Sequence, residues 1–254
     1  MLHKDFLSLH LRDLPYFRAL IRSVESVFYQ SLSLRAPVLD VGCGDGHFAS
    51  LTFERRIEVG IDPWCTPLYE ASRYAAYRWL VAAEGGRIPF QDGYFASAIS
   101  NSVLEHILHV DVTLNDVARV LLPGAPFYFC VPNERYLSEL SIAETAGCRY
   151  REWFRRITHV FHAEGPDIWE ARLAETGFNL EKWWHYFSPA AMRVLEWGHY
   201  FGLPSLLARK LTGKWILVPA RWNLWFTEKV ISRYASSEPI EDGVFTFYVA
   251  RKKV

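Results

Sequence analysis

Three glycines at alternate positions constrain the fold of this chain more than any other feature. Gly42, Gly44 and Gly46 follow the apolar segment Val38 to Val41 and precede a helix expected to begin at His47. Glycine has no Cβ to hold a ligand away from the backbone, and it adopts positive φ without strain. The unpaired N–H groups of the following helix would point at the same ligand. The pattern predicts a loop for a nucleotide-like cofactor at the carboxyl end of a parallel strand.

Apolar segments alternate with stretches of helical periodicity through the first half of the chain. We expect strands over 38–41, 57–62, 78–83, 95–100 and 127–131, and helices over 47–55, 68–76 and 111–121. Nearly continuous apolar strands separated by helices are typical of a parallel sheet covered on both faces. The sequence therefore predicts an α/β fold with a doubly wound, mostly parallel sheet.

An amphipathic helix is expected ahead of the first strand. Its apolar residues recur at helical spacing: Leu14, Phe17, Ile21, Val24 and Phe28. Arg18, Arg22 and Glu25 fall on the opposite face. We expect residues 1–35 to form a helical cap laid on the body of the protein.

The second half of the chain is less regular. Gly165 to Asp167 opens a helix that ends at Gly177, and a sixth strand is expected over 180–187. Residues 188 to about 234 indicate several helices broken by glycine and proline, and 243–252 returns to strand alternation. We therefore expect a helical insertion between the last two strands.

Charge and composition argue against several classes of function. The 254 residues carry 28 basic and 28 acidic side chains, so no net positive field favours nucleic acid. No window approaches the ~18 apolar residues that span a membrane, and the N-terminus lacks the apolar run of a signal peptide. The four cysteines show no metal-ligand spacing, and we expect them to be reduced and mostly buried. These features predict a cytoplasmic protein.

The glycine spacing and one acid narrow the choice of cofactor. A dinucleotide fingerprint needs its third glycine one position later, where His47 stands. Asp62 ends the second strand, and a carboxylate there can accept hydrogen bonds from both hydroxyls of a ribose. NAD and S-adenosylmethionine both offer that diol. A nicotinamide-dependent oxidoreductase therefore stays open as an alternative, although the glycine spacing disfavours it.

Three motifs in order resemble those of class I S-adenosylmethionine-dependent methyltransferases. They are Val38 to Gly46, Ile88 to Phe95 leading into Ser100 to His106, and Val117 to Gly124. Their order and spacing are most similar to those of the type-11 branch, the ubiquinone- and menaquinone-biosynthesis-like methyltransferases. Ala96 and Ala125 depart from the family pattern at positions that belong to the scaffold.

The resemblance implies a Rossmann-like fold with a seven-stranded sheet whose last strand runs antiparallel. It implies a single methyltransferase domain over 1–254. Within that domain we expect a cofactor-binding core at 36–187, a helical insertion at 188–236 and the final antiparallel strand at 237–254.

The resemblance also implies which residues surround S-adenosylmethionine. The glycine backbone should pass under the methionine part, Asp62 should bind the ribose, and Glu84 should contact the adenine amino group. The end of the fourth strand should face the acceptor. The implied cofactor-binding residues are Asp40, Gly42, Cys43, Gly44, Asp62, Pro63, Glu84, Gly85 and Ser100.

Methyl transfer from a sulfonium requires alignment and exclusion of water, and it requires a base only when the acceptor is a hydroxyl or an acidic carbon. The catalytic candidates are His106, Asn101 and Tyr16, with Phe17, His47 and Tyr186 as further acceptor-side candidates. Glu105 beside His106 could form an acid–base pair with it. His159 and His162 lie three apart on an expected helix but lack a third ligand, so we predict no metal site.

The aromatic-rich insertion, Ser188 to Tyr234, has three potential uses: a lid over the acceptor site, a homodimer surface or an interfacial membrane contact. We favour a lid. With the N-terminal helix it would enclose an aromatic-walled site beside Gly44 for a hydrophobic, lipid-like small molecule. A non-catalytic S-adenosylmethionine-binding partner protein stays open as an alternative. Nucleic-acid methylation is disfavoured, because Ser100 to Val103 differs from the base-methylation signature.

Overall fold

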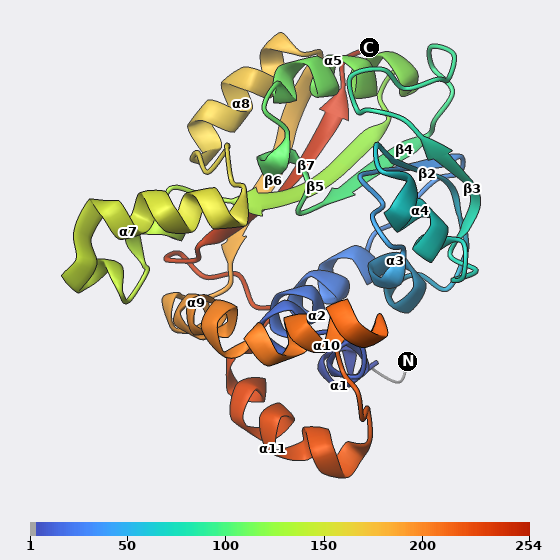
Figure 1. The fold of residues 1–254 in the computed structure, drawn as a ribbon. Helices are drawn as coiled ribbons and strands as arrows, with labels where there is room; N and C mark the ends of the chain where they lie inside the picture. Colours follow the sequence, from blue (N-terminus) through green and yellow to red (C-terminus); the bar gives the residue numbers. More distant parts are fainter. Residues whose placement is uncertain (1–3) are drawn as a thin grey trace.

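Seven strands form one sheet in residues 4–254, the part of the chain that the computed structural model describes. The strands are β1 (Val38–Val41), β2 (Ile57–Asp62), β3 (Tyr77–Ala82), β4 (Ser97–Asn101), β5 (Pro126–Pro132), β6 (Phe178–Tyr186) and β7 (Phe245–Lys252). Their order is β3-β2-β1-β4-β5-β7-β6 (Figure 1). β1 to β5 are parallel, and β7 runs antiparallel to both β5 and β6. The predicted α/β sheet with an antiparallel last strand is confirmed.

Helices cover both faces of this sheet. They are α1 (Phe6–Leu11), α2 (Tyr16–Gln30), α3 (His47–Thr52), α4 (Cys65–Ala71), α5 (Val110–Val120), α6 (Arg135–Ser138), α7 (Ala143–Thr158), α8 (Pro166–Glu175), α9 (Pro189–Phe201), α10 (Leu203–Thr212) and α11 (Arg221–Ile231). Two 3₁₀ turns, η1 (Leu104–His106) and η2 (Ser232–Tyr234), complete the set. Within residues 4–254, no helix is both long enough and apolar enough to cross a membrane.

Each face of the sheet carries its own apolar core. Successive side chains of a strand point to opposite faces, so Val38 belongs to one core and Leu39 to the other. The Leu39 core packs against α5 and α8, where Trp169 is fully buried. The Val38 core packs against α2. The central strands β1, β2, β4 and β5 are buried on both sides, which explains why they read as nearly continuous apolar runs.

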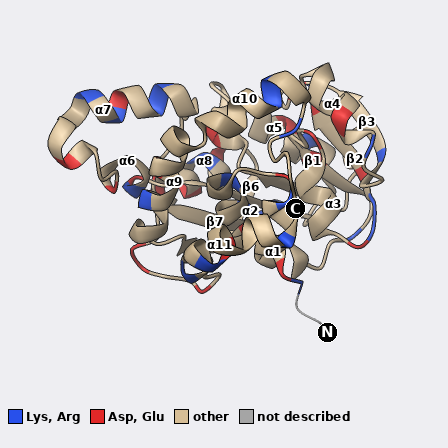
Figure 2. Cartoon of the chain, turned by 60° about the horizontal axis from the view of Figure 1, so that its bottom comes forward, with Lys and Arg blue, Asp and Glu red and all other residues tan. Residues whose placement is uncertain are grey.

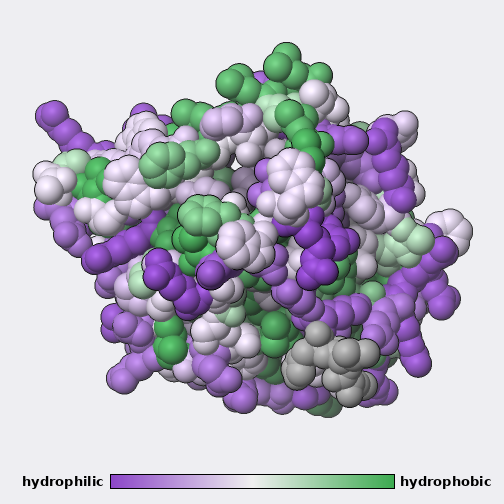
Figure 3. Space-filling view, turned by 90° about the horizontal axis from the view of Figure 1, so that it is seen from below, coloured by the Kyte–Doolittle hydropathy of each residue, from purple (hydrophilic) through white to green (hydrophobic). Residues whose placement is uncertain are grey.

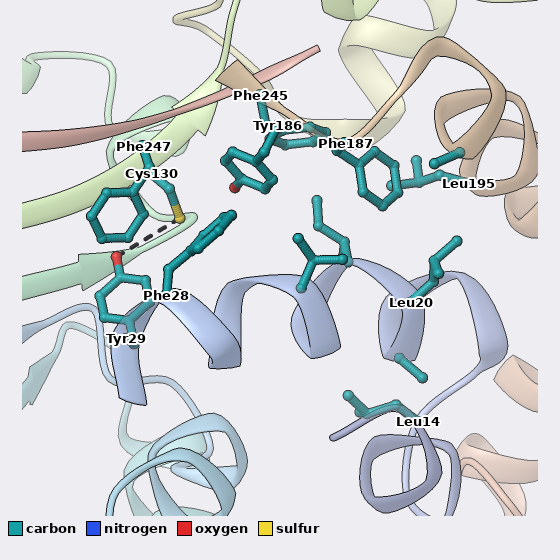
Figure 4. Packing of buried hydrophobic residues seen from close by; sticks show 14 of the residues in the cluster. Leu14, Leu20, Phe28, Tyr29, Cys130, Tyr186, Phe187, Leu195, Phe245 and Phe247 are labelled. Atoms are coloured by element: carbon teal, nitrogen blue, oxygen red, sulfur yellow. Dashed lines mark hydrogen bonds between the residues drawn. The ribbon is translucent and has the colours of Figure 1, made fainter. Parts of the chain in front are cut away.

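The long helix α2 packs on the face of the sheet that carries the Val38 core (Figure 4). Phe28 packs edge-on against Tyr186 and Phe247, with ring centroids 5.0 and 5.6 Å apart. The Tyr29 hydroxyl donates a hydrogen bond of 2.7 Å to the carbonyl of Ser100 and lies 3.8 Å from the sulfur of Cys130. α2 is therefore fixed to the centre of the sheet by aromatic packing and by a buried polar contact.

The predicted helical insertion between the last two strands is present as α9, α10, α11 and η2. It lies below the sheet, beside α1 and α2 (Figure 1). A Cβ at Gly198 of α9 would stand 2.3 Å from the Cβ of Phe17 in α2. Only glycine at this position lets the two helices approach so closely.

Several element boundaries differ from expectation. The fourth strand begins at Ser97, because Phe95 forms only an isolated bridge with Leu121. The helix α7 was not anticipated, and it ends at Thr158, so His159 and His162 do not share a helix as expected. Cys65 and Cys148 are exposed, so only Cys43 and Cys130 fit the expectation of buried thiols. Met1 to His3, the start of the expected cap, lie outside the described residues.

Candidate functional site

A cavity of about 980 Å³ opens at the carboxyl ends of β1, β2, β3 and β4. Most of the residues predicted from the sequence meet there, although they come from segments far apart in the chain. The predicted residues that line it are Asp40, Gly42, Cys43, Gly44, Asp62, Pro63, Glu84, Gly85, Asn101 and His106. Ligands of α/β folds bind at this edge of a parallel sheet, because the helix N-termini and the loops converge on it.

The glycine loop has the geometry expected of a ligand cradle. Gly42, Gly44 and Gly46 have φ of 78°, 55° and 73°. A Cβ at Gly42 would stand 2.3 Å from Val103, so this residue allows a close packing contact. In the part of the chain that the structure describes, no atom lies within 4 Å of the place where a Cβ at Gly44 would stand. The Gly44 backbone therefore faces open space in the cavity, and a ligand can approach it directly.

Asp62 ties this loop to the end of β2. Its Oδ2 accepts a hydrogen bond of 3.1 Å from the Gly44 N–H, and its Oδ1 accepts one of 3.0 Å from the Trp64 N–H. Burial raises the pKa of Asp62, while these two backbone hydrogen bonds oppose the shift. A carboxylate has about four acceptor positions, so both oxygens keep capacity for a ligand diol.

Asp40 lies deeper in the same cavity. The Tyr77 hydroxyl donates a hydrogen bond of 2.6 Å to its Oδ2. Burial raises the pKa of Asp40 to about 7, and the bond from Tyr77 opposes that shift. Asp40 is therefore harder to ionise than an exposed carboxyl group, and a bound cation would favour the ionised form.

Glu84 and Gly85 form the far end of the cavity, beyond β3. The Ala83 N–H donates a 3.1 Å hydrogen bond to the carbonyl of Asp62, which holds this segment beside β2. A Cβ at Gly85 would stand 2.6 Å from the methyl group of Thr113 in α5. The glycine thus lets the segment approach α5, and Glu84 remains exposed at the rim.

A buried polar network from α2, which the sequence pattern does not indicate, forms another wall. Glu25 is fully buried, and its Oε2 accepts hydrogen bonds from Arg22 at 2.8 Å and from the Asn101 amide at 2.9 Å. Its Oε1 accepts hydrogen bonds from the Ser102 hydroxyl at 2.8 Å and the Tyr186 hydroxyl at 3.0 Å. The polar face of the amphipathic helix therefore points into the site.

This network also fixes two residues at the end of β4. Asn101 is engaged on both sides, because Arg22 donates to its Oδ1 while its amide nitrogen donates to Glu25. Ser102 has a φ of 50°, in the left-handed region that is unfavourable for most residues. Glu25 holds its hydroxyl there, which is consistent with a strained, functional position.

His106 lies at the boundary between this cavity and a second one. Its Nδ1 is 2.9 Å from the carbonyl of His159, so this nitrogen carries the proton in the neutral ring and Nε2 is left as an acceptor. Burial lowers the pKa of His106, and the bond to His159 opposes that shift. His106 is therefore largely neutral at pH 7.

The neighbouring carboxyl group of Glu105 is buried, and it is protonated at neutral pH. Burial raises the pKa of Glu105 to about 8. Its Oε1 lies 3.9 Å from the Nε2 of His106, and its Oε2 has no hydrogen-bond partner among residues 4–254. A neutral carboxylic acid can donate its own proton, and its unpaired oxygen can accept a hydrogen bond from a ligand.

The second cavity has a volume of about 430 Å³ and adjoins the first. The two cavities share Arg18, Arg22, Ser102 and His106. Beyond these residues the walls of the second cavity are mainly apolar and include Phe17, Ile21, Pro132, Ile157, Val160, Leu195 and Phe245. The arrangement provides a second, mainly apolar chamber that adjoins the first at the shared polar residues and also contains Glu105, Thr158, His159 and His199.

Three sequence candidates lie elsewhere. Ser100 is fully buried, and its hydroxyl donates a 2.9 Å hydrogen bond to the carbonyl of Val41, so it joins β4 to β1 behind the cavity wall. Tyr16 packs edge-on against Phe17 at the start of α2 and is not part of the lining of either cavity. Tyr186 is occupied by its hydrogen bond to Glu25. His47, by contrast, does line the large cavity, with its Nε2 3.2 Å from Asp13.

The prediction that tryptophans of the insertion form an aromatic wall of the cavity is wrong. Trp215 lies between Arg18 and Arg209, whose guanidinium carbons are 5.5 and 5.2 Å from its ring centroid, while Trp222 and Trp225 are exposed. From α10, the cavity lining includes Arg209. Arg209 also forms a 2.8 Å ion pair with Glu70 of α4. The insertion therefore reaches the cavity with a cation and does not present its tryptophans to it.

The sequence matches a family model described as "Methyltransferase domain" over residues 11–207. No curated protein matches the sequence significantly. Solved structures resemble it at low identity. One is the [4+2]-cyclase SpnF, with 18% identity, a TM-score of 0.58, and coverage of 93% of this chain and 82% of the other.

Two further structures of similar fold are described as methyltransferases. One is a SAM-dependent enzyme of Thermotoga maritima, described as a possible histamine N-methyltransferase, with 14% identity, a TM-score of 0.57 and coverage of 94% and 91%. The other is the geranyl diphosphate C-methyltransferase of Streptomyces coelicolor, with 14% identity, a TM-score of 0.57 and coverage of 94% and 84%. At these identities the likeness establishes a shared fold.

Proposed function

Because the chain belongs to the methyltransferase-domain family, we propose that it transfers a methyl group from S-adenosylmethionine to a small, mainly apolar acceptor. The observation that carries this proposal is the pair of adjoining cavities. The larger is lined by the glycine loop and by acids suited to a nucleoside cofactor, and the smaller is mainly apolar. Placement in the type-11 branch stays a prediction from the sequence motifs.

The residues of the large cavity fit S-adenosylmethionine. Gly44 leaves open space for a ligand against the backbone, and Asp62 retains acceptor capacity for a ribose diol. Asp40 offers a carboxyl group to the ammonium of the methionine part, and Glu84 lies at the distant end, near the expected adenine position. The bound cofactor supplies a methyl group activated by a positively charged sulfur. The protein's own contribution is to orient it and to exclude water.

We assign the smaller cavity to the acceptor. Its apolar walls bind a hydrophobic body, and His106 and Ser102 stand where that cavity meets the larger one. The unprotonated Nε2 of His106 is suited to accept a proton from a hydroxyl or an acidic carbon of the acceptor. Glu105, whose pKa is raised to about 8, already carries its own proton at neutral pH, so the proton taken up by Nε2 leaves to solvent from His106, whose side chain is 45% exposed.

Asn101 has a different role in this proposal. Both ends of its amide are already bound within the Arg22–Glu25 network, so it acts as a positioning residue and not as a proton carrier. Tyr16 is not part of the lining of either cavity, so this proposal assigns it no role in the step. The network instead holds the end of β4 rigid beside the proposed point of transfer.

Cofactor binding is tested by calorimetry and thermal denaturation with S-adenosylmethionine, S-adenosylhomocysteine and NAD. Ligand at about a hundred times its Kd should stabilise the fold by about 2.7 kcal/mol. Asp62→Asn should weaken binding of either sulfur ligand by about 10- to 150-fold, the equivalent of one charge-assisted hydrogen bond. Stabilisation by NAD alone would overturn the assignment in favour of an oxidoreductase.

Catalysis needs a separate experiment, because a non-catalytic partner protein would also bind S-adenosylmethionine and be stabilised by it. Release of S-adenosylhomocysteine should be measured with a set of small apolar alcohols, phenols and carboxylic acids. Turnover with one of them, reduced by His106→Ala while cofactor affinity is unchanged, would support the proposal. Tight cofactor binding without turnover on any acceptor class would favour the non-catalytic alternative.

A further inference from the structure

Helix α10 turns its apolar face to solvent. Its leucines Leu203, Leu207 and Leu211 recur every four residues and are exposed, Leu211 at 84%. The opposite side carries Arg209, which faces inward to Glu70. A surface helix of a globular protein normally buries its apolar stripe and exposes its charges. The arrangement in α10 is the reverse, so the core does not account for its leucines.

Helix α11 continues the same kind of surface. Leu224 and Ile231 are its buried anchors. Trp222, Trp225 and Phe226, spaced along another face, are all exposed, Trp222 at 78% and Phe226 at 68%. Leu217 and Val218, in the segment between the two helices, are exposed as well. We call the exposed apolar residues of 203–230 the insertion surface. Figure 3, viewed from below, shows apolar side chains gathered on this side of the molecule among charged ones.

The charges interleaved with the insertion surface are almost all positive. Apart from Arg209, which faces inward, residues 203–233 contain Lys210, Lys214, Arg221, Lys229 and Arg233, but only one acid, Glu228. The whole chain, by contrast, has equal numbers of basic and acidic residues. Blue ribbon on α10 in Figure 2 marks basic residues there. The ammonium of Lys229 lies 5.1 Å from the ring centroid of Trp225, so cation and aromatic residue share one face.

This charge pattern selects among the partners that could cover the surface. A two-fold homodimer would place the same cations against each other, which costs free energy. A lid function leaves the exposed leucines and tryptophans unexplained, because Arg209 is the α10 side chain that reaches the cavity. An anionic lipid bilayer satisfies both features. Leucine and tryptophan enter the boundary between headgroups and acyl chains, and lysine and arginine meet the phosphates.

We propose that the insertion surface docks on anionic lipid bilayers, with α10 and α11 lying in the membrane interface. The protein should sediment with phosphatidylcholine vesicles that contain phosphatidylglycerol and bind pure phosphatidylcholine vesicles far more weakly. Raising the salt concentration should weaken binding to the anionic vesicles, because the lysine–phosphate attraction is screened.

Two sets of substitutions separate the apolar from the electrostatic contribution to vesicle binding. Trp222→Ser with Trp225→Ser should reduce partitioning onto anionic vesicles by roughly tenfold or more. Lys210→Glu, Lys214→Glu and Lys229→Glu together should reduce it about a hundredfold, from about fivefold for each lysine near an anionic surface. Trp79→Ser is the matched control, because Trp79 on β3 is 70% exposed and lies outside the surface. It should bind like the unmodified protein.

Circular dichroism identifies any variant that has lost its fold, and Leu207→Ser with Leu211→Ser then tests the same surface from α10. The proposal is overturned if the unmodified protein does not sediment with anionic vesicles. Binding that persists after both the tryptophan and the lysine substitutions would also overturn it. Light scattering that reports a dimer, dissociated by Trp222→Ser with Trp225→Ser, would assign the surface to a second copy of the chain instead.

Discussion

Gly44 and Asp40 impose different physical conditions on whatever occupies the large cavity. Gly44 combines a φ of 55° with open space at the Cβ position, so the constraint there is on shape. Asp40 is a buried acid with a pKa of about 7, so the constraint there is on charge. A ligand that satisfies both must lie close to the backbone and bring a positive group to Asp40.

Gly44→Val should abolish or greatly weaken S-adenosylhomocysteine binding, by about a hundredfold or more. The branched side chain would occupy the space that a ligand needs, and it would also be strained at positive φ. Calorimetry measures the affinity. Gly124→Val is the matched control, because Gly124 has a φ of 72° and an equally open Cβ position but lies in the turn before β5. Equal loss of affinity in both variants would show that strain, and not occupied space, is the cause.

The affinity for S-adenosylhomocysteine should depend on pH through Asp40. The pKa of Asp40 is raised to about 7, so the carboxylate that attracts an ammonium group is present above pH 7 and is lost below it. Affinity should fall about tenfold per pH unit below 7, down to the pKa of the bound form. Asp40→Asn should bind weakly with a flat profile. A flat profile in the unmodified protein would contradict this role.

At the scale of elements, α2 does more than cover the sheet. Its apolar residues pack beneath β7, while Arg22 and Glu25 on another side hold the end of β4. The helix separates the two cavities, because Arg18 and Arg22 belong to both linings. A change in the position of α2 would therefore move the proposed cofactor and acceptor sites together.

Glu25→Ala should reduce the free energy of unfolding by roughly 3–5 kcal/mol, measured by urea denaturation. It leaves Arg22, Asn101, Ser102 and Tyr186 without their shared acceptor, and breaking a buried pair is costly. Glu144→Ala is the matched control, because Glu144 pairs with Arg193 on the surface, where both side chains are more than half exposed. That change should cost no more than about 1 kcal/mol. Equal effects would mean that the network contributes little.

For the whole molecule, the buried titratable groups set opposing pH dependences. Burial lowers the pKa of His10 to about 3, so below pH 6.5 the unfolded chain binds a proton that the folded one rejects. The contribution of His10 to stability therefore rises with pH up to about 6.5. Burial raises the pKa of Glu105 to about 8, so above its ordinary pKa the folded chain keeps a proton that the unfolded one has released. This contribution falls as the pH rises.

The free energy of unfolding should therefore decline between pH 6.5 and 8, by about 2 kcal/mol from Glu105 over this range. Chemical denaturation at closely spaced pH values measures the slope. Glu105→Gln is uncharged and should flatten it. If stability rises over this interval in the unmodified protein, Glu105 is ionised in the folded state, and the raised pKa of its carboxyl group is refuted.

Much of the sheet and of the cofactor side could be predicted from the sequence, for local reasons. The alternation of apolar strands and helices follows from burial on both faces, and the glycine loop follows from its backbone requirement. Asp40, Asp62 and Glu84 end or follow strands of a parallel sheet, and the carboxyl ends of such strands meet at one edge. Their convergence on one cavity is thus a consequence of position along each strand.

The acceptor side of the site could not be predicted from the sequence, because tertiary contacts decide which side chains line it. The polar face of α2 looked like any surface face, yet Glu25 is buried because α2 lies across the ends of β4 and β6. The aromatic residues of the insertion looked like the wall of a site, yet Trp222 and Trp225 face outward. Helical periodicity fixes which residues share a face, but the neighbouring elements decide what that face meets. That choice lies in long-range packing, which no local pattern encodes.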